Sequence, residues 1–198
     1  LSLYIHIPFC SELCYYCGCN KVITRHQSKA DVYLDYLTKE IAAHAPLFKH
    51  YTVEQLHLGG GTPTFLTVKQ MTRLINLLEQ HFHFTRNTER SIEIDPRSLA
   101  KDMLIHLRVL GFNRVSFGIQ DFNDEVQQAV NRTQQVDTVK ALITQARELG
   151  FKSINAEILG NQFHLTNVIV NLLENSIKYS EDVPEIDLYT DISIKFFK

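Results

Sequence analysis

The sequence predicts an α/β fold: an open, partial parallel βα barrel that is truncated after about five strands. Short apolar runs alternate with segments of helical periodicity along residues 1–155, and this alternation is typical of parallel strands joined by crossover helices. Polar or glycine-rich motifs follow several of the apolar runs directly. A complete barrel of eight units takes about 250 residues, or about 31 per unit. Residues 1–155 therefore supply about five units.

The expected strands coincide with the apolar runs. The first is "LSLYIHIP", residues 1–8, which alternates in apolar character and ends at Pro8 because proline lacks an amide donor. The other strands are expected at 55–60, 91–95, 114–120 and 152–158, and the helices at 67–82, 98–110, 123–130 and 136–149. Ligands of such barrels collect at the carboxyl ends of the strands, so the site is expected there.

Composition restricts the class of protein. Of the 198 residues, 44% are hydrophobic and 21% are charged, which is enough for one moderate domain or two small ones. A formal net charge of -2 provides no basic field for nucleic acid or an anionic membrane surface. No apolar run approaches the roughly 20 residues of a membrane span, and nothing resembles a signal peptide. We expect a cytoplasmic protein without nucleic-acid or membrane partners, whose natural N-terminus lies upstream of Leu1.

The cysteines form one cluster on the segment after the first strand. All four lie within ten positions, at Cys10, Cys14, Cys17 and Cys19. Disulfides are rare in reducing compartments, and two bridges in so short a segment would be strained, so metal binding is expected. The Cys-x3-Cys-x2-Cys spacing favours a [4Fe–4S] cluster with one iron left open. The alternative is zinc, with a fourth ligand from Cys19, His6 or His26.

The string "YIHIPFCSELCYYCGCN", with Tyr16 before the third cysteine, resembles the radical SAM superfamily. More narrowly, it is similar to the oxygen-independent coproporphyrinogen III oxidases of haem biosynthesis. The resemblance continues through "LHLGGGTPTFL", "SIEIDPR", "GFNRVSFGIQDFN" and "VNRTQ", and covers about residues 1–155. It implies a barrel of the radical SAM type, a cluster on Cys10, Cys14 and Cys17, and no metal-binding role for Cys19.

The resemblance also implies an oxidoreductase. The open iron would bind S-adenosylmethionine (SAM) and reduce it, and the resulting 5′-deoxyadenosyl radical would abstract hydrogen from propionate side chains of coproporphyrinogen III. Loss of CO2 and an electron would then leave vinyl groups and protoporphyrinogen IX. A tetrapyrrole substrate and an electron donor are the implied partners; the oligomeric state is not implied.

The resemblance further assigns contacts to SAM, or to a second SAM molecule. The residues so assigned are Tyr4, Tyr16, Gly60, Gly61, Thr62, Glu93, Gln120, Arg132 and Glu157. The glycine run 59–61 would hold the SAM amino group and Glu93 a ribose, while Glu157 stands where the family carries an aspartate. Taken alone, Tyr4 is equally a core aromatic, and Arg132 is more often a surface arginine. Asp95, before Pro96, is expected to be a turn residue.

After residue 155 the family pattern ends, and residues 156–198 are expected to form a second unit, a helix followed by a β-hairpin. An apolar stripe at helical spacing runs from Leu165 to Ile177. "NLLENSIKYS" resembles the N-box of sensor histidine kinases. That resemblance implies that Asn175 holds ATP-bound Mg²⁺ and that Asn171, Lys178 and Tyr179 line the nucleotide. The alternatives to a radical SAM enzyme impaired by truncation are therefore an ATP-binding kinase fragment or an inactive chimera.

Overall fold

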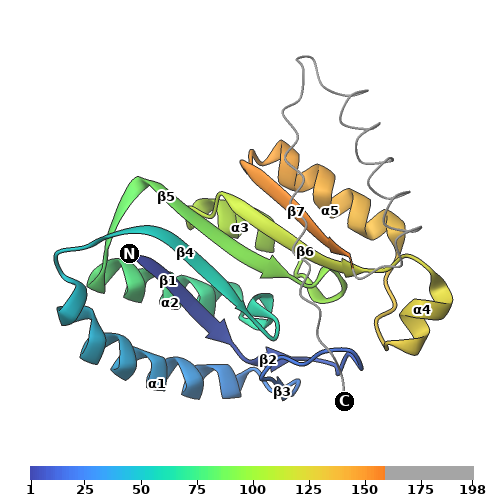
Figure 1. Ribbon diagram of the computed structural model, residues 1–198, viewed down its shortest axis with the longest axis horizontal. Helices are drawn as coiled ribbons and strands as arrows, with labels where there is room; N and C mark the ends of the chain where they lie inside the picture. The colour runs from blue at the N-terminus through green and yellow to red at the C-terminus, as the bar shows by residue number, and fades with distance from the viewer. Residues whose placement is uncertain (159–198) are drawn as a thin grey trace. The chain divides into compact units, whose positions relative to one another are not determined.

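The fold is built on one five-stranded sheet in which every neighbouring pair of strands is parallel. The computed structural model describes residues 1–158. The strand order is β1-β4-β5-β6-β7, as Figure 1 shows. The strands are β1 (Ser2–Ile7), β4 (Thr52–Gly60), β5 (His83–Ile94), β6 (Arg114–Gln120) and β7 (Ser153–Ile158). The open, partial parallel βα barrel of five strands expected from the sequence is confirmed.

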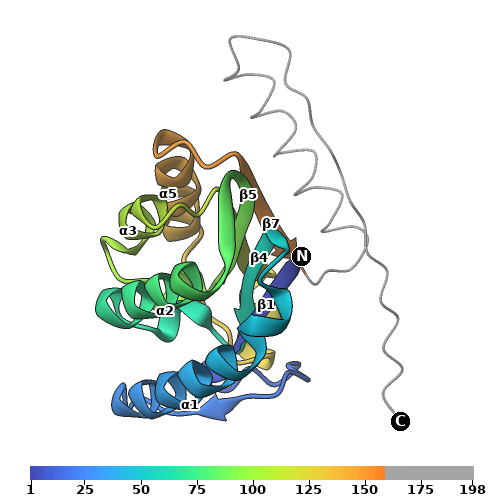
Figure 2. The ribbon, with the colours of Figure 1, turned by 90° about the vertical axis from the view of Figure 1, so that its left-hand side faces the viewer.

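Helices cover one face of this sheet (Figure 2). They are α1 (Ser28–His44), α2 (Val68–His81), α3 (Met103–Val109) and α5 (Val136–Glu148), while the short α4 (Asp124–Ala129) follows the carboxyl end of β6. Three 3-10 turns, η1 (Ala45–Phe48), η2 (Pro63–Phe65) and η3 (Pro96–Ser98), complete the connections. A second, two-stranded sheet pairs β2 (Phe9–Cys10) with β3 (Val22–Ile23).

Local sequence explains why α2 begins and packs where it does. Thr67 Oγ1 accepts a hydrogen bond from the Gln70 amide, and Gln70 Oε1 accepts one from the Thr67 amide, which is a capping box. The buried residues that follow recur every three or four positions: Met71, Leu74, Ile75 and Leu78. Such spacing places one apolar stripe against the sheet. The expected helix at 67–82 is thus confirmed nearly to the residue.

The largest differences from the sequence-based expectation concern β5, α3 and α1. Strand β5 begins at His83, eight residues early, because "HFTRNTER" is polar but pairs with β4 across a register shift between Val53 and Gln55. The helix expected at 98–110 begins only at Met103, since Pro96–Ser98 forms a separate 3-10 turn. Helix α1 was not expected at all, although its buried residues Ala30, Leu34, Leu37 and Ile41 follow helical spacing.

The core lies between the sheet and its helices. Residues from both layers are fully buried, among them Leu58, Leu74, Ile92, Leu104 and Phe117. None of the helices within residues 1–158 is both long and apolar enough to cross a membrane. Apart from residues 156–158, the expected second unit with its N-box helix and hairpin lies outside the described residues.

Leu58 on the inner strand β4 provides a test of this core. We expect Leu58→Ala to lower the free energy of unfolding by about 2–5 kcal/mol, since a buried leucine leaves a cavity. Leu58 is 0% exposed, whereas Leu47 on η1 is 71% exposed. Leu47→Ala is therefore the matched control, and urea denaturation followed by circular dichroism measures both. Equal losses in the two variants would contradict this packing.

Candidate metal centre and cofactor site

The segment that carries the cysteines leaves the carboxyl end of β1 and is closed at its base. The Val22 amide donates to the Pro8 carbonyl at 2.7 Å, and the Thr24 amide donates to the Cys10 carbonyl at 2.9 Å. These bonds belong to the β2–β3 pairing. We call residues 11–21 between the two strands the cysteine loop. Its two ends are held together, so the sulfur atoms it carries are confined to one region.

The tip of the cysteine loop is fixed by a second segment, distant in sequence. The Tyr15 amide donates to the Val130 carbonyl at 3.0 Å. Asn131 Nδ2 donates to the Leu13 carbonyl at 2.7 Å. Asn131 lies in the left-handed region with φ of 53°, a conformation that asparagine adopts more readily than most residues. The connection between α4 and α5 therefore positions the cysteine loop.

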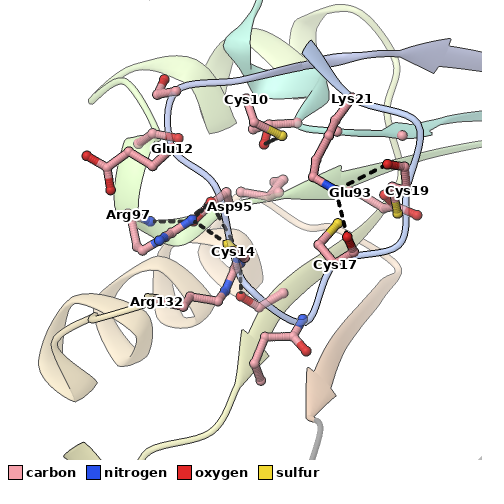
Figure 3. A pocket seen from close by; sticks show the side chains of 18 of the residues that line it. Cys10, Glu12, Cys14, Cys17, Cys19, Lys21, Glu93, Asp95, Arg97 and Arg132 are labelled. Atoms are coloured by element: carbon pink, nitrogen blue, oxygen red, sulfur yellow. Dashed lines mark hydrogen bonds and ion pairs between the residues drawn. The ribbon is translucent and has the colours of Figure 1, made fainter. Parts of the chain in front are cut away.

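One pocket brings the expected residues together (Figure 3). It lies at the carboxyl ends of the strands and has a volume of about 280 Å³. Its lining includes Cys10, Cys14, Tyr16, Cys17, Gly60, Gly61, Thr62, Glu93, Gln120, Arg132 and Glu157. Of the residues assigned from the sequence, Tyr4 does not line it. Residues 1–158 thus gather all but one of the expected site residues around a single cavity.

The glycine run brings bare backbone against the first cysteine. A Cβ on Gly61 would lie 2.9 Å from Cys10 Sγ and 2.9 Å from the Phe9 carbonyl oxygen. Thr62 Oγ1 donates to Cys10 Sγ at 3.5 Å. Burial raises the pKa of the Cys10 thiol, and the Thr62 hydrogen bond offsets part of this rise. Gly60 has φ of +120°, which only glycine adopts without strain.

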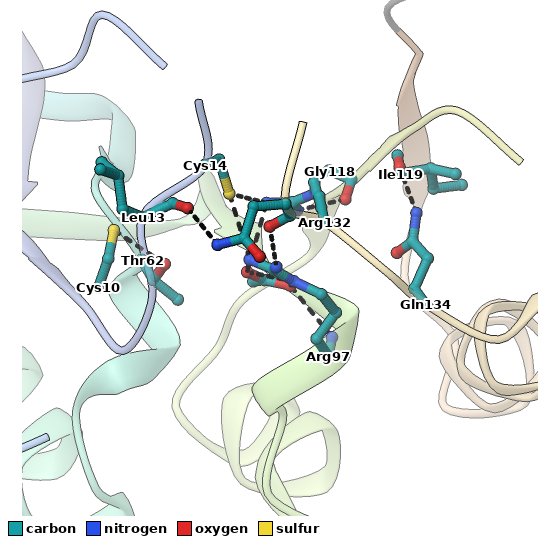
Figure 4. A network of polar contacts seen from close by, with 11 residues as sticks. Cys10, Leu13, Cys14, Thr62, Arg97, Gly118, Ile119, Arg132 and Gln134 are labelled. Atoms are coloured by element: carbon teal, nitrogen blue, oxygen red, sulfur yellow. Dashed lines mark hydrogen bonds and ion pairs between the residues drawn. The ribbon is translucent and has the colours of Figure 1, made fainter. Parts of the chain in front are cut away.

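A buried ion-pair network (Figure 4) lines another part of the same pocket. Asp95 Oδ2 accepts from Arg97 Nη2 at 2.6 Å and from Arg132 Nη1 at 3.4 Å. Both guanidinium groups also donate to Cys14 Sγ, each at 3.4 Å. We call Cys14, Asp95, Arg97 and Arg132 the arginine network.

The two arginines determine the charge state of Asp95. Burial opposes ionisation of the carboxyl group, but the hydrogen bonds from Arg97 and the charges of Arg132 and Arg97 outweigh it, so the pKa of Asp95 is lowered. Burial likewise opposes the charged guanidinium of Arg97, yet its hydrogen bonds and its attraction to Asp95 raise its pKa above the ordinary value. Asp95 and Arg97 therefore both stay charged inside the pocket.

Asp95 was expected only to form a turn, and that expectation was incomplete. Its Oδ1 does accept from the Arg97 amide at 3.1 Å. Its carboxylate also holds two arginines, of which Arg97 was not expected at the site. The only signal in the sequence is the spacing in "DPR": an arginine two residues after an acidic residue at a strand end. Lys21, which donates to the Cys17 carbonyl at 2.6 Å and lines the pocket, gave no such signal.

Tyr4 on β1 and Glu93 on β5 lie on either side of β4, which carries His57 and the glycine run. Glu93 Oε1 pairs with His57 Nε2 at 3.3 Å, and the Tyr4 ring stacks on the His57 ring with 5.7 Å between centroids. Burial, and secondarily the charge of Glu93, raise the pKa of Tyr4. Tyr4 is 57% exposed, so it is not a core aromatic. It stands next to the pocket without lining it.

Gln120 and Glu157 lie near the carboxyl ends of β6 and β7, and Arg132 lies on the connection between α4 and α5. Gln120 is buried and has φ of 73°, a strained conformation of the kind that concentrates at functional sites. Arg132 Nη2 donates to the Gly118 carbonyl at 2.5 Å, while its buried Nε has no hydrogen-bond partner among the described residues. Glu157 Oε1 accepts from Ser116 Oγ at 3.0 Å. Arg132 is therefore a buried arginine with an unused donor, not a surface residue.

The donor set fits an iron–sulfur cluster better than a single ion. Within residues 1–158, no three His, Cys, Asp or Glu side chains are grouped closely enough to hold one metal ion. A [4Fe–4S] cluster binds each cysteine through a different iron, so the sulfurs surround the cluster without meeting at one point. Three cysteines around one cavity, with bare glycine backbone beside them, meet that requirement.

Comparisons with known proteins agree with this geometry. Residues 4–162 match the model of the Radical SAM superfamily. The oxygen-independent coproporphyrinogen III oxidase of Salmonella typhimurium is 56% identical over 159 residues, which are 80% of this chain and 35% of that protein. The enzyme of the same name from Escherichia coli K12 has the same identity and coverage. The chain therefore spans only about a third of the length of these curated relatives.

Two solved structures are similar as well. Coproporphyrinogen III oxidase (HemN) from Escherichia coli, described as a radical SAM enzyme, has a TM-score of 0.82 at 50% identity and covers 87% of this chain and 41% of its own. Methylornithine synthase has a TM-score of 0.55 at 15% identity, covering 90% of this chain and 50% of its own, and so supports the fold alone. Because the superfamily model matches well over half of its length, this chain belongs to the Radical SAM superfamily.

Proposed function

We propose that this chain carries the cluster- and cofactor-binding part of an oxidoreductase that decarboxylates coproporphyrinogen III without oxygen. The observation that carries the proposal is the convergence of Cys10, Cys14, Cys17 and the glycine run on one pocket. The 56% identity to enzymes named for this activity supports the choice of substrate. Membership of the superfamily implies a [4Fe–4S] cluster and SAM as cofactors.

Each part of the pocket has a role in this proposal. Cys10, Cys14 and Cys17 would hold the cluster, and Gly60 and Gly61 would expose backbone groups to the SAM amino group. When bound, the cluster and SAM supply a one-electron reductive cleavage that leads to hydrogen abstraction from a propionate and loss of CO2 and an electron. The protein provides binding, orientation and electrostatics for that chemistry.

The other residues would orient the cofactor and limit its access to water. Glu93, paired with His57, would hold a ribose. The buried Nε of Arg132 offers a donor that the described residues leave unused, and a cofactor carboxylate is a suitable acceptor for it. Tyr16 is half-buried, and its burial raises its pKa, so it stays neutral and serves as a wall of the pocket. Thr62, Gln120 and Glu157 line the same space. Thr62 and Gln120 would contact a second SAM molecule, and Glu157 would contact the cofactor from the position of the family's aspartate.

The cellular context is part of the proposal. A tetrapyrrole with propionate side chains would be the substrate and a cytoplasmic electron donor the source of reducing equivalents. The ATP-binding alternative depends on Asn171, Asn175, Lys178 and Tyr179, which lie outside the described residues. No observation within residues 1–158 favours it, so a histidine-kinase function is not proposed.

The first test concerns the ligands of the cluster. After anaerobic reconstitution with iron and sulfide, the chain should show the broad visible absorbance of a [4Fe–4S] cluster. Cys14→Ala should lose this band because one iron loses its thiolate, whereas Cys19→Ala should keep it. Absorbance together with iron content measures both. Equal loss in the two variants would indicate a four-thiolate site instead.

The glycine run is tested by a pair of alanine substitutions. A Cβ at Gly61 would press on Cys10 Sγ and on backbone at 2.9 Å, whereas a Cβ at Gly18, between Cys17 and Cys19, would have nothing within 4 Å. We expect Gly61→Ala to retain less iron and to bind SAM more weakly than Gly18→Ala. Iron analysis and equilibrium dialysis with labelled SAM provide the readouts. Indistinguishable variants would argue against close packing of the run on the cluster.

Turnover of the tetrapyrrole provides the third test. We expect weak or no conversion of coproporphyrinogen III by the 198-residue chain, with uncoupled SAM cleavage as the residual activity. The chain spans only 35% of its curated relatives, and the Glu157 carboxylate reaches about 1.5 Å farther than that of an aspartate. Displacements of this size cost on the order of a hundredfold in rate.

An anaerobic assay with dithionite, SAM and substrate, read by mass spectrometry for vinyl products, measures this turnover. The Escherichia coli relative serves as the reference enzyme. Turnover close to that of the reference would show that the chain is sufficient as it stands.

A further inference from the structure

One of the three cysteines differs from the others in its surroundings. Cys14 is buried, and its Sγ accepts from Arg97 Nη2 and Arg132 Nη1, each at 3.4 Å. Figures 3 and 4 show both side chains directed at the sulfur. Cys10 Sγ, in contrast, accepts from the neutral hydroxyl of Thr62. Two positively charged donors therefore meet at a single cluster ligand.

Arg97 is held in this orientation by contacts that do not involve the cysteine. Its Nε donates to Asp95 Oδ1 at 3.0 Å and its Nη2 to Asp95 Oδ2 at 2.6 Å, a bidentate arrangement. Its Nη1 reaches the Asn131 carbonyl at 3.3 Å. The Arg97 and Asp95 side chains are only 16% and 10% exposed. A planar guanidinium fixed in this way loses little freedom when it donates to a further acceptor.

The charges at the sulfur do not cancel. Arg97 and Arg132 are both cationic, and Asp95 is the anion of the arginine network that pairs with both. A net positive charge thus remains beside Cys14 in a site largely shielded from water, where electrostatic interactions are stronger than in bulk solvent. Hydrogen bonds to ligating sulfurs and nearby positive charge are among the features that determine the reduction potential of an iron–sulfur cluster.

We propose that Arg97, held by Asp95, raises the reduction potential of the cluster through its hydrogen bond to Cys14 Sγ. Reduction adds one electron to the cluster, and part of the added negative charge falls on its sulfur ligands. A cationic donor at one of those sulfurs stabilises the reduced form more than the oxidised form. Arg97 acts through Cys14 and is therefore a positioning residue. This inference rests on the proposed cluster site. It adds that a residue next to the cluster sets how readily the cluster accepts an electron.

Arg97 is the better subject for a test than Arg132. The resemblance assigns Arg132 to SAM, and its Nη2 also supports the Gly118 carbonyl, so a substitution there would change several properties together. Arg97→Gln removes the charge and the bidentate fork, whereas Arg97→Lys keeps the charge but presents it as a compact ammonium. Arg25→Gln is the matched control. It removes a charge from the segment just after the cysteine loop, where Arg25 pairs with Glu12 at 3.1 Å and is 77% exposed.

The experiment is a potentiometric titration of the reconstituted 198-residue chain without SAM, monitored by electron paramagnetic resonance of the reduced cluster. We expect Arg97→Gln to lower the ratio of reduced to oxidised cluster at a fixed potential by about tenfold, which is about 59 mV for a one-electron couple. Arg97→Lys should lie between this variant and the parent. Arg25→Gln should match the parent.

Several outcomes would overturn the inference. Unchanged potentials in both Arg97 variants would do so, and so would an equal shift in Arg25→Gln, which would indicate general charge in place of the hydrogen bond. Loss of the cluster from both Arg97 variants, with retention in Arg25→Gln, would make Arg97 an assembly residue and not a determinant of the potential. If the unsubstituted chain held no cluster, the proposed function would fail and this inference with it.

Discussion

The parallel register of five strands is the constraint on which the site depends. Because all five run in the same direction, their carboxyl ends meet at one edge, and the register aligns Ile7 with Gly60 and Gly118 with Glu157. Segments that leave those ends, including the cysteine loop and the turn at Asp95, must therefore project into the same space. Ligand sites of parallel α/β folds lie at this edge for the same reason. The direction of the strands therefore determines where the pocket lies, whatever side chains line it.

Within that frame the site combines two kinds of surface. One part of its surface is bare backbone, where Gly61 leaves no room for a side chain beside Cys10 and Gly60 leaves none beside His6. Another part is the arginine network, where burying charge carries a large desolvation cost that is recovered only through close pairing and hydrogen bonds. Asp95 provides both for Arg97 and Arg132. Uncharged glycine backbone lets a cofactor come close to the chain, and the two arginines place positive charge beside it. Both features suit a cofactor that is itself charged and redox-active.

The sequence predicts those features that depend on local pattern. The boundaries of α2, β6 and β7 follow from periodicity and capping, and the cysteines and glycines are recognisable by spacing. Features that depend on contacts between residues far apart in the sequence could not be predicted from it. The polar first half of β5 is a strand because β4 lies beside it, and Arg97 meets Cys14 across 83 positions of chain. Tyr4 was assigned to the cofactor but stands beside the pocket, and the roles of the lining residues stay predictions.

The tie between Leu13 and Asn131 has a consequence for biosynthesis. Those residues are 118 positions apart, so the N-terminal cysteines leave the ribosome long before the segment that positions them. Synthesis proceeds at about 5–20 residues per second, which leaves an interval of several seconds during which the cysteine loop has only its β2–β3 base and its neighbours in β1 and β4 to hold it. Cluster delivery to a finished site must then follow synthesis of β6 and α4. The order of the chain thereby places cluster insertion after four of the five strands of the main sheet have been made.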